Sequence, residues 1–186
     1  KHNHLIFQLN NSIDLIYNDV RKFGFFKILE FDMLNFNKHI AKLGPEPLSN
    51  KFNFNYLKSK ITKSKKNMKN FMMDQKYVSG LGNIYVNEIL FLSSINPRKY
   101  VCKLSNEEVV NLLKNTKKIL DLSIQLGGSS IRDFNSTSGQ NGSFQQKFMV
   151  YNRENEPCRK KQCSGNVKKV YISNRSTFFC TKCQNN

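Results

Sequence analysis

The order of apolar and polar residues predicts β-structure at the start of the chain. Two short alternating runs flank a polar turn at residues 10–12, a pattern typical of a β-hairpin. The alternating positions are Leu5, Phe7, Leu9, Ile13, Leu15 and Tyr17. After an interruption at residues 19–24, another strand is expected from Phe25 to Leu29. The rigid segment Leu-Gly-Pro-Glu-Pro-Leu at residues 43–48 then predicts a domain boundary.

Helical spacing of apolar residues follows this boundary. One helix is predicted from about Ile84 to Ser93, and a longer one after Ser105, which can form a capping box with Glu108. The pair of glycines at 127–128 ends the longer helix. Positions at helical spacing within it are Val109, Leu112, Leu113, Thr116, Ile119, Leu120 and Leu126. The chain therefore reads as a β-rich start followed by a helical domain.

A tight glycine turn stands directly before the first of these helices. Gly80 and Gly82 supply the backbone freedom that such a turn needs, and Asn83 falls where the first N–H groups of the helix have no partner. Backbone donors, the positive end of the helix dipole and an amide side chain are expected to point outward together. This arrangement is typical of a phosphate site, although glycine and asparagine are also ordinary capping residues.

The charge of the chain indicates a polyanionic partner. Thirty Lys and Arg residues against 13 Asp and Glu give a formal net charge of +17. Such a charge releases counterions from a phosphate backbone, so nucleic-acid binding should depend strongly on salt. An AT-biased genome explains part of the lysine excess, and the lysine-rich segment 58–69 is also compatible with a solvated helix face.

Four of the five cysteines fall in one C-terminal block. They form two close pairs, which are Cys158 with Cys163 and Cys180 with Cys183. Two such pairs, joined by a strand-like segment at 167–172, are typical of a zinc ribbon, in which four thiolates surround one ion. We therefore expect one structural zinc ion, with disulfides as the alternative. The fifth, Cys102, is expected to be a packing residue.

No stretch of the sequence approaches the roughly 20 apolar residues of a membrane span, and no signal segment opens the chain. We expect a soluble, intracellular protein without a membrane partner.

Six segments, taken in order, resemble the formamidopyrimidine-DNA glycosylases, which are bacterial base-excision repair enzymes. They are Asp-Val-Arg-Lys-Phe-Gly at 19–24, the 43–48 boundary, Asp-Gln-Lys to Gly-Leu-Gly-Asn-Ile-Tyr at 74–85, Gly-Gly-Ser-Ser-Ile-Arg-Asp-Phe at 127–134, Val-Tyr-Asn-Arg-Glu-Asn-Glu-Pro-Cys at 150–158, and Asn-Arg-Ser-Thr-Phe-Phe-Cys-Thr-Lys-Cys-Gln at 174–184. The related endonuclease VIII shares the turn and the ribbon, but residues 83–91 favour the formamidopyrimidine branch.

The resemblance implies an α+β fold with three parts. Residues 1–43 would be the end of an N-terminal β-sandwich catalytic domain, residues 49–147 a helix-two-turn-helix DNA-binding domain, and residues 148–186 a β-hairpin zinc ribbon. The implied partner is damaged double-stranded DNA, bound by a monomer in the bacterial cytoplasm and at the nucleoid.

The resemblance also implies site residues. Asn83 and Arg175 correspond to residues that grip the phosphates flanking the lesion, and Arg175 also to the proton donor of δ-elimination. Arg21 and Phe23 correspond to the pair that fills the gap left by a flipped nucleotide. Weaker DNA-contact matches are His2 and the neighbourhood of Ser64 and Lys65, and Lys76 corresponds to a position near the damaged base. Residues 133–142 are expected to form a mobile loop. The overlapping segment 136–148 corresponds to the flexible cover over the damaged base.

The implied activity is that of a bifunctional glycosylase and abasic-site lyase. Such an enzyme removes 8-oxoguanine and formamidopyrimidines and nicks the strand by β,δ-elimination. Family members begin with a proline nucleophile followed by a glutamate, whereas this chain begins Lys1-His2-Asn3-His4. We therefore expect an N-terminally truncated sequence that is inactive alone, without a substitute lysine nucleophile.

Three alternatives stay open at this point. The chain could be a non-catalytic fragment that binds damaged DNA, or an endonuclease VIII-like glycosylase for oxidised pyrimidines. A zinc-ribbon factor for RNA or transcription would explain the ribbon and the charge, but not the motif at 74–97.

Overall fold

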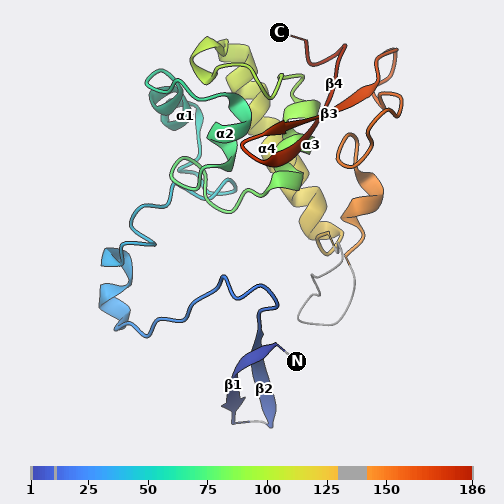
Figure 1. The fold of residues 1–186 in the computed structure, drawn as a ribbon. Coiled ribbons are helices and arrows are strands. Elements are labelled where there is room, and N and C mark those ends of the chain that lie inside the picture. Colours follow the sequence, from blue (N-terminus) through green and yellow to red (C-terminus); the bar gives the residue numbers. More distant parts are fainter. Residues whose placement is uncertain (1, 11, 130–141, 186) are drawn as a thin grey trace. The chain divides into compact units, whose positions relative to one another are not determined.

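The computed structural model describes residues 2–10, 12–129 and 142–185. The chain divides into two compact units, residues 1–41 and residues 42–186 (Figure 1). The fold class is α+β as expected, because the described part combines helices with two separate antiparallel hairpins.

The first unit contains the predicted hairpin. Strands β1 (Asn3–Leu9) and β2 (Ile13–Asn18) pair antiparallel, with Phe7 opposite Leu15. A short 3₁₀ helix, η1 (Phe31–Phe36), follows further along the chain. The hairpin confirms the reading of the alternating pattern.

The strand expected from Phe25 to Leu29 is wrong. These residues have no regular structure, and among the described residues β1 and β2 pair only with each other. The aromatic rings of this segment pack through side chains instead, Phe26 edge-on against Tyr17 at 4.7 Å and Phe25 beside His39 at 4.9 Å. A strand needs a ladder partner, and alternation alone does not supply one.

The second unit is built around helices. They are α1 (Phe54–Ile61), α2 (Met68–Met73), α3 (Asn83–Leu92) and α4 (Asn106–Gln125), with short 3₁₀ helices η2 (Val101–Lys103) and η3 (Phe144–Lys147). Helix α3 contacts α2 and α4, and its residues Val86, Ile89 and Leu90 belong to the main buried core. The sequence predicted this helix from about Ile84 to Ser93, so the helix is confirmed and each predicted end lies one residue too late.

Local signals set the ends of these helices. Ser105 and Glu108 form the predicted capping box at the start of α4, and Gly127 and Gly128 after its end have positive φ values of 71° and 81°. Helices α1 and α2 begin at asparagine caps, since Asn53 accepts the N–H of Tyr56 and Asn67 that of Asn70.

The C-terminal segment forms the expected ribbon hairpin. Strands β3 (Val167–Ile172) and β4 (Arg175–Cys180) pair antiparallel around a turn at residues 173–174, both with positive φ. Their apolar face joins Phe91 of α3 and Val150 in a second small core. None of the helices in the described part of the chain has the length and apolarity of a bilayer span.

Candidate nucleic-acid interface

The four C-terminal cysteines converge on one point. Their sulfur atoms all lie within 4.8 Å of one another, with Cys158 Sγ 3.8 Å from Cys183 Sγ and Cys163 Sγ 3.7 Å from Cys180 Sγ. A tetrahedron with Zn–S bonds of about 2.3 Å has edges of about 3.8 Å, so the spacing fits a Cys₄ zinc site. The same spacing is far longer than a disulfide bond, which argues against that alternative.

Neighbouring residues hold Cys180, the ligand at the end of β4, in place. The N–H of Cys180 donates to Gln184 Oε1 at 2.9 Å, and a side chain at Gly165 would lie 2.8 Å from Cys180 Sγ. Although burial opposes ionisation, N–H groups of Cys183 and Lys182 lower the pKa of Cys180 to about 7. The predicted packing role of Cys102 is wrong, because this residue is exposed on η2.

The glycine turn before α3 is closed by a residue that the sequence did not single out. Gln75 accepts the N–H of Gly80 at 2.7 Å and donates to the carbonyl of Leu81 at 3.1 Å. Gly80 has a φ of 82°, which favours glycine. The N–H groups of residues 83–85 have no acceptor among the described residues, so the start of α3 can bind an anion.

The sequence predicted that the side chain of Asn83 points outward together with these N–H groups. The structure shows instead that it turns toward β4. Its Nδ2 donates to the carbonyl of Ser176 on β4 at 3.1 Å, whereas its Oδ1 is buried without a hydrogen-bond partner. The structure therefore brings Asn83 and Arg175, which are 92 positions apart in the sequence, to adjoining places on α3 and β4.

Lys69 is the main residue of this surface that the sequence did not distinguish. It belongs to the lysine-rich segment, but only 1% of it is exposed, and its Nζ donates to the carbonyl of Asn83 at 3.3 Å. Burial lowers the pKa of Lys69 to about 7, and the positive charge of Arg175 acts in the same direction. No sequence signal separates this lysine from its exposed neighbours.

A cavity of about 430 Å³ lies beside Lys69 and Arg175. Its lining residues are Lys66, Lys69, Asn70, Met73, Asp74, Ile172, Ser173 and Arg175. Lys66 pairs with Asp74 at 2.5 Å, which leaves Lys69 and Arg175 without a carboxylate partner among the described residues. The cavity therefore suits an anion such as a phosphate group.

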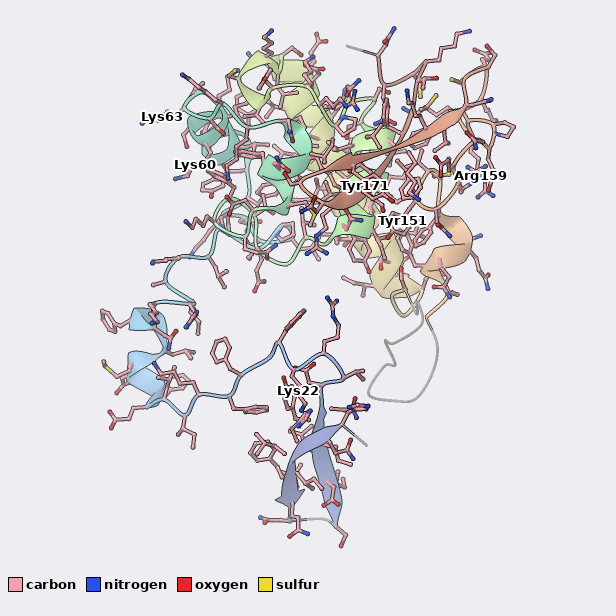
Figure 2. All side chains as sticks on the ribbon, viewed as in Figure 1. Lys22, Lys60, Lys63, Tyr151, Arg159 and Tyr171 are labelled. Carbon is pink, nitrogen blue, oxygen red and sulfur yellow. The ribbon has the colours of Figure 1, made fainter. Side chains whose placement is uncertain are left out.

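The weaker DNA-contact candidates of the second unit are close in sequence to residues that line this cavity, but they differ in exposure. Ser64 is buried, and its Oγ accepts the N–H of Lys66 at 3.3 Å, so it shapes the backbone. Lys65 and Lys76 are exposed. Figure 2 shows Lys60 and Lys63 projecting outward from the end of α1. Exposed lysines thus flank the buried Lys69 on both sides in the sequence.

In the first unit, Asp19 organises the loop that carries Arg21 and Phe23. Its carboxylate accepts the N–H groups of Arg21, Lys22 and Gly24 at 3.0, 2.8 and 2.8 Å. The bond from Gly24 is the main cause that lowers the pKa of Asp19 to about 2. A side chain at Gly24 would collide with the hydroxyl of Tyr17 and force that ring to move.

The loop presents its aromatic residue to solvent. Phe23 is 77% exposed, and the guanidinium of Arg21 lies 4.7 Å from the centre of its ring. His2 helps to close the loop, because its carbonyl accepts the N–H of Asp19 at 3.1 Å. The bonds to Asp19 hold the backbone on both sides of Phe23, so this exposed ring is carried by an ordered loop.

The segment compared with a flexible cover falls partly outside the described residues. Residues 136–141 are not described, and residues 144–147 form η3. Directly after it, the buried carboxylate of Glu88 on α3 accepts the N–H groups of Met149, Val150 and Tyr151 at 2.8, 3.1 and 2.8 Å. Glu88 thereby fixes the entrance of the ribbon, a role the sequence did not reveal.

Comparison with known sequences finds a family model and several relatives that match this chain. The model of the formamidopyrimidine-DNA glycosylase H2TH domain matches residues 43–135. The formamidopyrimidine-DNA glycosylase of Ruegeria sp. (strain TM1040) is 41% identical over 184 residues, which cover 99% of this chain and 65% of that protein. The corresponding protein of Bradyrhizobium sp. (strain BTAi1) is 40% identical, with coverage of 98% and 64%. The chain spans slightly less than two thirds of these relatives.

Solved structures agree with the sequence comparison. The MutM (Fpg) protein from Thermus thermophilus superposes with a TM-score of 0.89 at 31% identity, covering 100% of this chain and 69% of that one. Lactococcus lactis Fpg, in a complex with DNA containing an abasic site, gives a TM-score of 0.90 at 36% identity, covering 100% and 67%. On sequence and structure together, the chain belongs to the formamidopyrimidine-DNA glycosylase family.

Proposed function

We propose that this chain is part of a base-excision repair enzyme that acts on damaged double-stranded DNA. The proposed enzyme is a bifunctional DNA glycosylase and abasic-site lyase, which removes 8-oxoguanine and formamidopyrimidines and nicks the strand by β,δ-elimination. The observation that carries the proposal is the cavity between α2 and the β3–β4 hairpin, which is lined by Lys69 and Arg175 and suits a phosphate. Lys69 also contacts the start of α3 through the carbonyl of Asn83. The DNA complex of the Lactococcus lactis relative supports the same partner class.

Each candidate residue receives a role within this proposal. Asn83 and Arg175 contact phosphates beside the lesion, and Arg175 donates the proton of the δ-elimination step. Arg21 faces the orphaned base, and Phe23 fills the space that the flipped nucleotide leaves, because unstacked bases expose apolar faces. Additional DNA contacts are assigned to His2, Lys65 and Lys76. Ser64, which is buried, would support such contacts through the backbone N–H of Lys66 that it accepts.

The domain assignment follows the same proposal. Residues 1–43 form the end of the catalytic β-sandwich domain, residues 49–147 the helix-two-turn-helix domain, and residues 148–186 the zinc ribbon. Zinc bound by the four cysteines supplies structural cross-linking of the ribbon and takes no part in the reaction. We place the protein, as a monomer, at the nucleoid in the bacterial cytoplasm.

Binding of the zinc-loaded 186-residue chain to labelled duplexes tests the proposed partner. One duplex carries a tetrahydrofuran abasic analogue opposite cytosine, and a second has the same sequence without damage. Fluorescence anisotropy should give tighter binding to the first duplex, with a strong dependence on salt. Equal affinity for the two duplexes would contradict a lesion-binding role.

Borohydride trapping separates the enzyme from the non-catalytic binding module. We expect residues 1–186 alone to form no trapped adduct with 8-oxoguanine duplex, and a chain extended by an N-terminal Pro-Glu segment and the strands that follow it in relatives to form one. An extended chain that binds lesions yet never forms an adduct favours the binding module. Preference for an oxidised pyrimidine over 8-oxoguanine would instead favour the endonuclease VIII-like alternative.

A further inference from the structure

One edge of strand β4 is bonded to amide side chains rather than to another strand. The carbonyl of Ser176 accepts from Asn83 Nδ2 at 3.1 Å, and the N–H of Phe178 donates to Asn87 Oδ1 at 2.7 Å. Further along the same strand, the N–H of Cys180 donates to Gln184 Oε1. Alternate residues of a strand direct their backbone groups to the same edge, so these three bonds lie in a row.

Asn87 has a special place in this row because both ends of its amide are used. Its Nδ2 donates to the carbonyl of Asn83 at 2.7 Å, the same oxygen that Lys69 contacts, while its Oδ1 accepts from Phe178. Only 1% of Asn87 is exposed, so water cannot replace either bond. One buried side chain thus connects the start of α3 to β4.

These bonds fix the position of Arg175 relative to Asn83. Phe178 lies three residues after Arg175 on β4, a span of about 10 Å at about 3.3 Å per residue. The bond from Asn83 to Ser176 holds the strand closer to Arg175, but it uses an amide that is itself a proposed phosphate contact. The Asn87 bond is independent of that amide and can hold β4 when Asn83 engages DNA.

We propose that Asn87 is a positioning residue that holds the two phosphate contacts, Asn83 and Arg175, as one site across the boundary between α3 and the ribbon. The inference rests on the proposed function for its DNA readout. Asn87 touches no DNA in this account and acts through β4, so its effect should depend on the presence of the Arg175 side chain.

A double-mutant cycle with the zinc-loaded 186-residue chain tests this inference. Asn87→Leu keeps the number and branching of the side-chain heavy atoms and removes both hydrogen bonds. We expect it to weaken binding to the abasic-analogue duplex about tenfold, and by about twofold or less when Arg175→Ala is already present. Zinc content should stay at the wild-type value. Val109→Ala, a buried change on α4, is the control for a general loss of stability.

Two results would overturn the inference: an undiminished effect of Asn87→Leu in the Arg175→Ala background, or no effect in the wild-type background. A wild-type chain that fails to bind the duplex would instead refute the proposed function. If Asn87→Leu does not fold, Asn87→Ser serves with a readout that needs no DNA. Nitrogen-15 relaxation of the Arg175 Nε–H group should then show greater motion than in the wild type, and unchanged motion would refute the positioning role.

Discussion

The Nζ atom of Lys69 lies 3.3 Å from the carbonyl oxygen of Asn83, at the start of α3. This amine has a pKa of about 7, lowered first by burial and then by Arg175. A phosphate in the adjoining cavity favours the charged form, so DNA binding above pH 7 should be accompanied by proton uptake. Affinity for the abasic-analogue duplex should therefore fall between pH 7 and pH 9, as measured by anisotropy at constant ionic strength.

Matched lysine variants check this pH dependence. Lys69→Met should remove most of it, whereas Lys76→Met, at an exposed position, should leave it in place. The contribution of Lys69 to the pH dependence of folding stability has the opposite sign to that of an ordinary ion-paired lysine. The unfolded chain holds a proton on Lys69 up to about pH 10.4, while the folded chain releases it near pH 7, so this residue makes folding stability rise with pH across that window. A steeper fall of affinity in Lys69→Met would contradict the assignment.

The ribbon should carry one zinc ion per chain. Cys180→Ser removes a ligand from a set whose sulfur atoms lie within 4.8 Å of one another, so it should lower the metal content sharply. Chelation should also disorder β3 and β4 while α4 stays folded, which proton–nitrogen spectra can follow. Cys102→Ser is the control and should retain the metal. Full metal content in Cys180→Ser would contradict a four-thiolate site.

Changes at Arg175 and Asn83 should have different salt signatures. Arg175→Ala removes a cation, so the slope of log affinity against log salt should shrink by about one unit. Asn83→Ala should weaken binding without this change in slope, because the amide is neutral. Lesion preference should survive both variants, since phosphate contacts position a protein rather than specify a sequence.

Lys117→Ala, on an exposed position of α4, is the control for the salt measurements and should change neither quantity. An unchanged slope together with unchanged affinity in Arg175→Ala would remove β4 from the interface.

Gly24→Ala should disrupt the loop that carries Arg21 and Phe23. The new methyl group would collide with the hydroxyl of Tyr17 and displace the N–H that Asp19 accepts. The pKa of Asp19, which lies at about 2, should then rise toward its ordinary value, as carbon-13 titration can measure. Gly82→Ala is the matched control, because nothing lies within 4 Å of the added carbon. An Asp19 pKa that is unaffected by Gly24→Ala would contradict this account of the loop.

The features that the sequence predicted well are those set by local chemistry. Ser105 and Glu108 cap a helix through neighbours three residues apart, and the hairpin at residues 3–18 follows from alternation around a short turn. The cysteine pairs belong to the same class, because the two cysteines of each pair are close in sequence and the strand-like segment between the pairs predicts a hairpin that brings them together. Residue type and spacing are sufficient for such features.

The features that the sequence missed depend on segments far apart in the chain. Lys69 is distinguished from Lys65 by its burial and by its contact with the Asn83 carbonyl on α3. The side-chain direction of Asn83 depends on Ser176. The segment 25–29 shows the converse error, since a strand-like composition does not create a pairing partner. Burial and pairing are properties of the assembled fold, so spacing in the sequence does not report them.

The bonds between α3 and the ribbon also have a consequence for how the protein folds. Glu88 accepts N–H groups 61–63 residues away, and the amides of Asn83 and Asn87 meet β4 at separations of 93 and 91 residues. Closing such long loops costs entropy before any contact compensates for it. The helices, whose contacts are local, should therefore form early in refolding. The ability to hold a phosphate should appear last, so a chain can regain its helical signal while still unable to bind DNA.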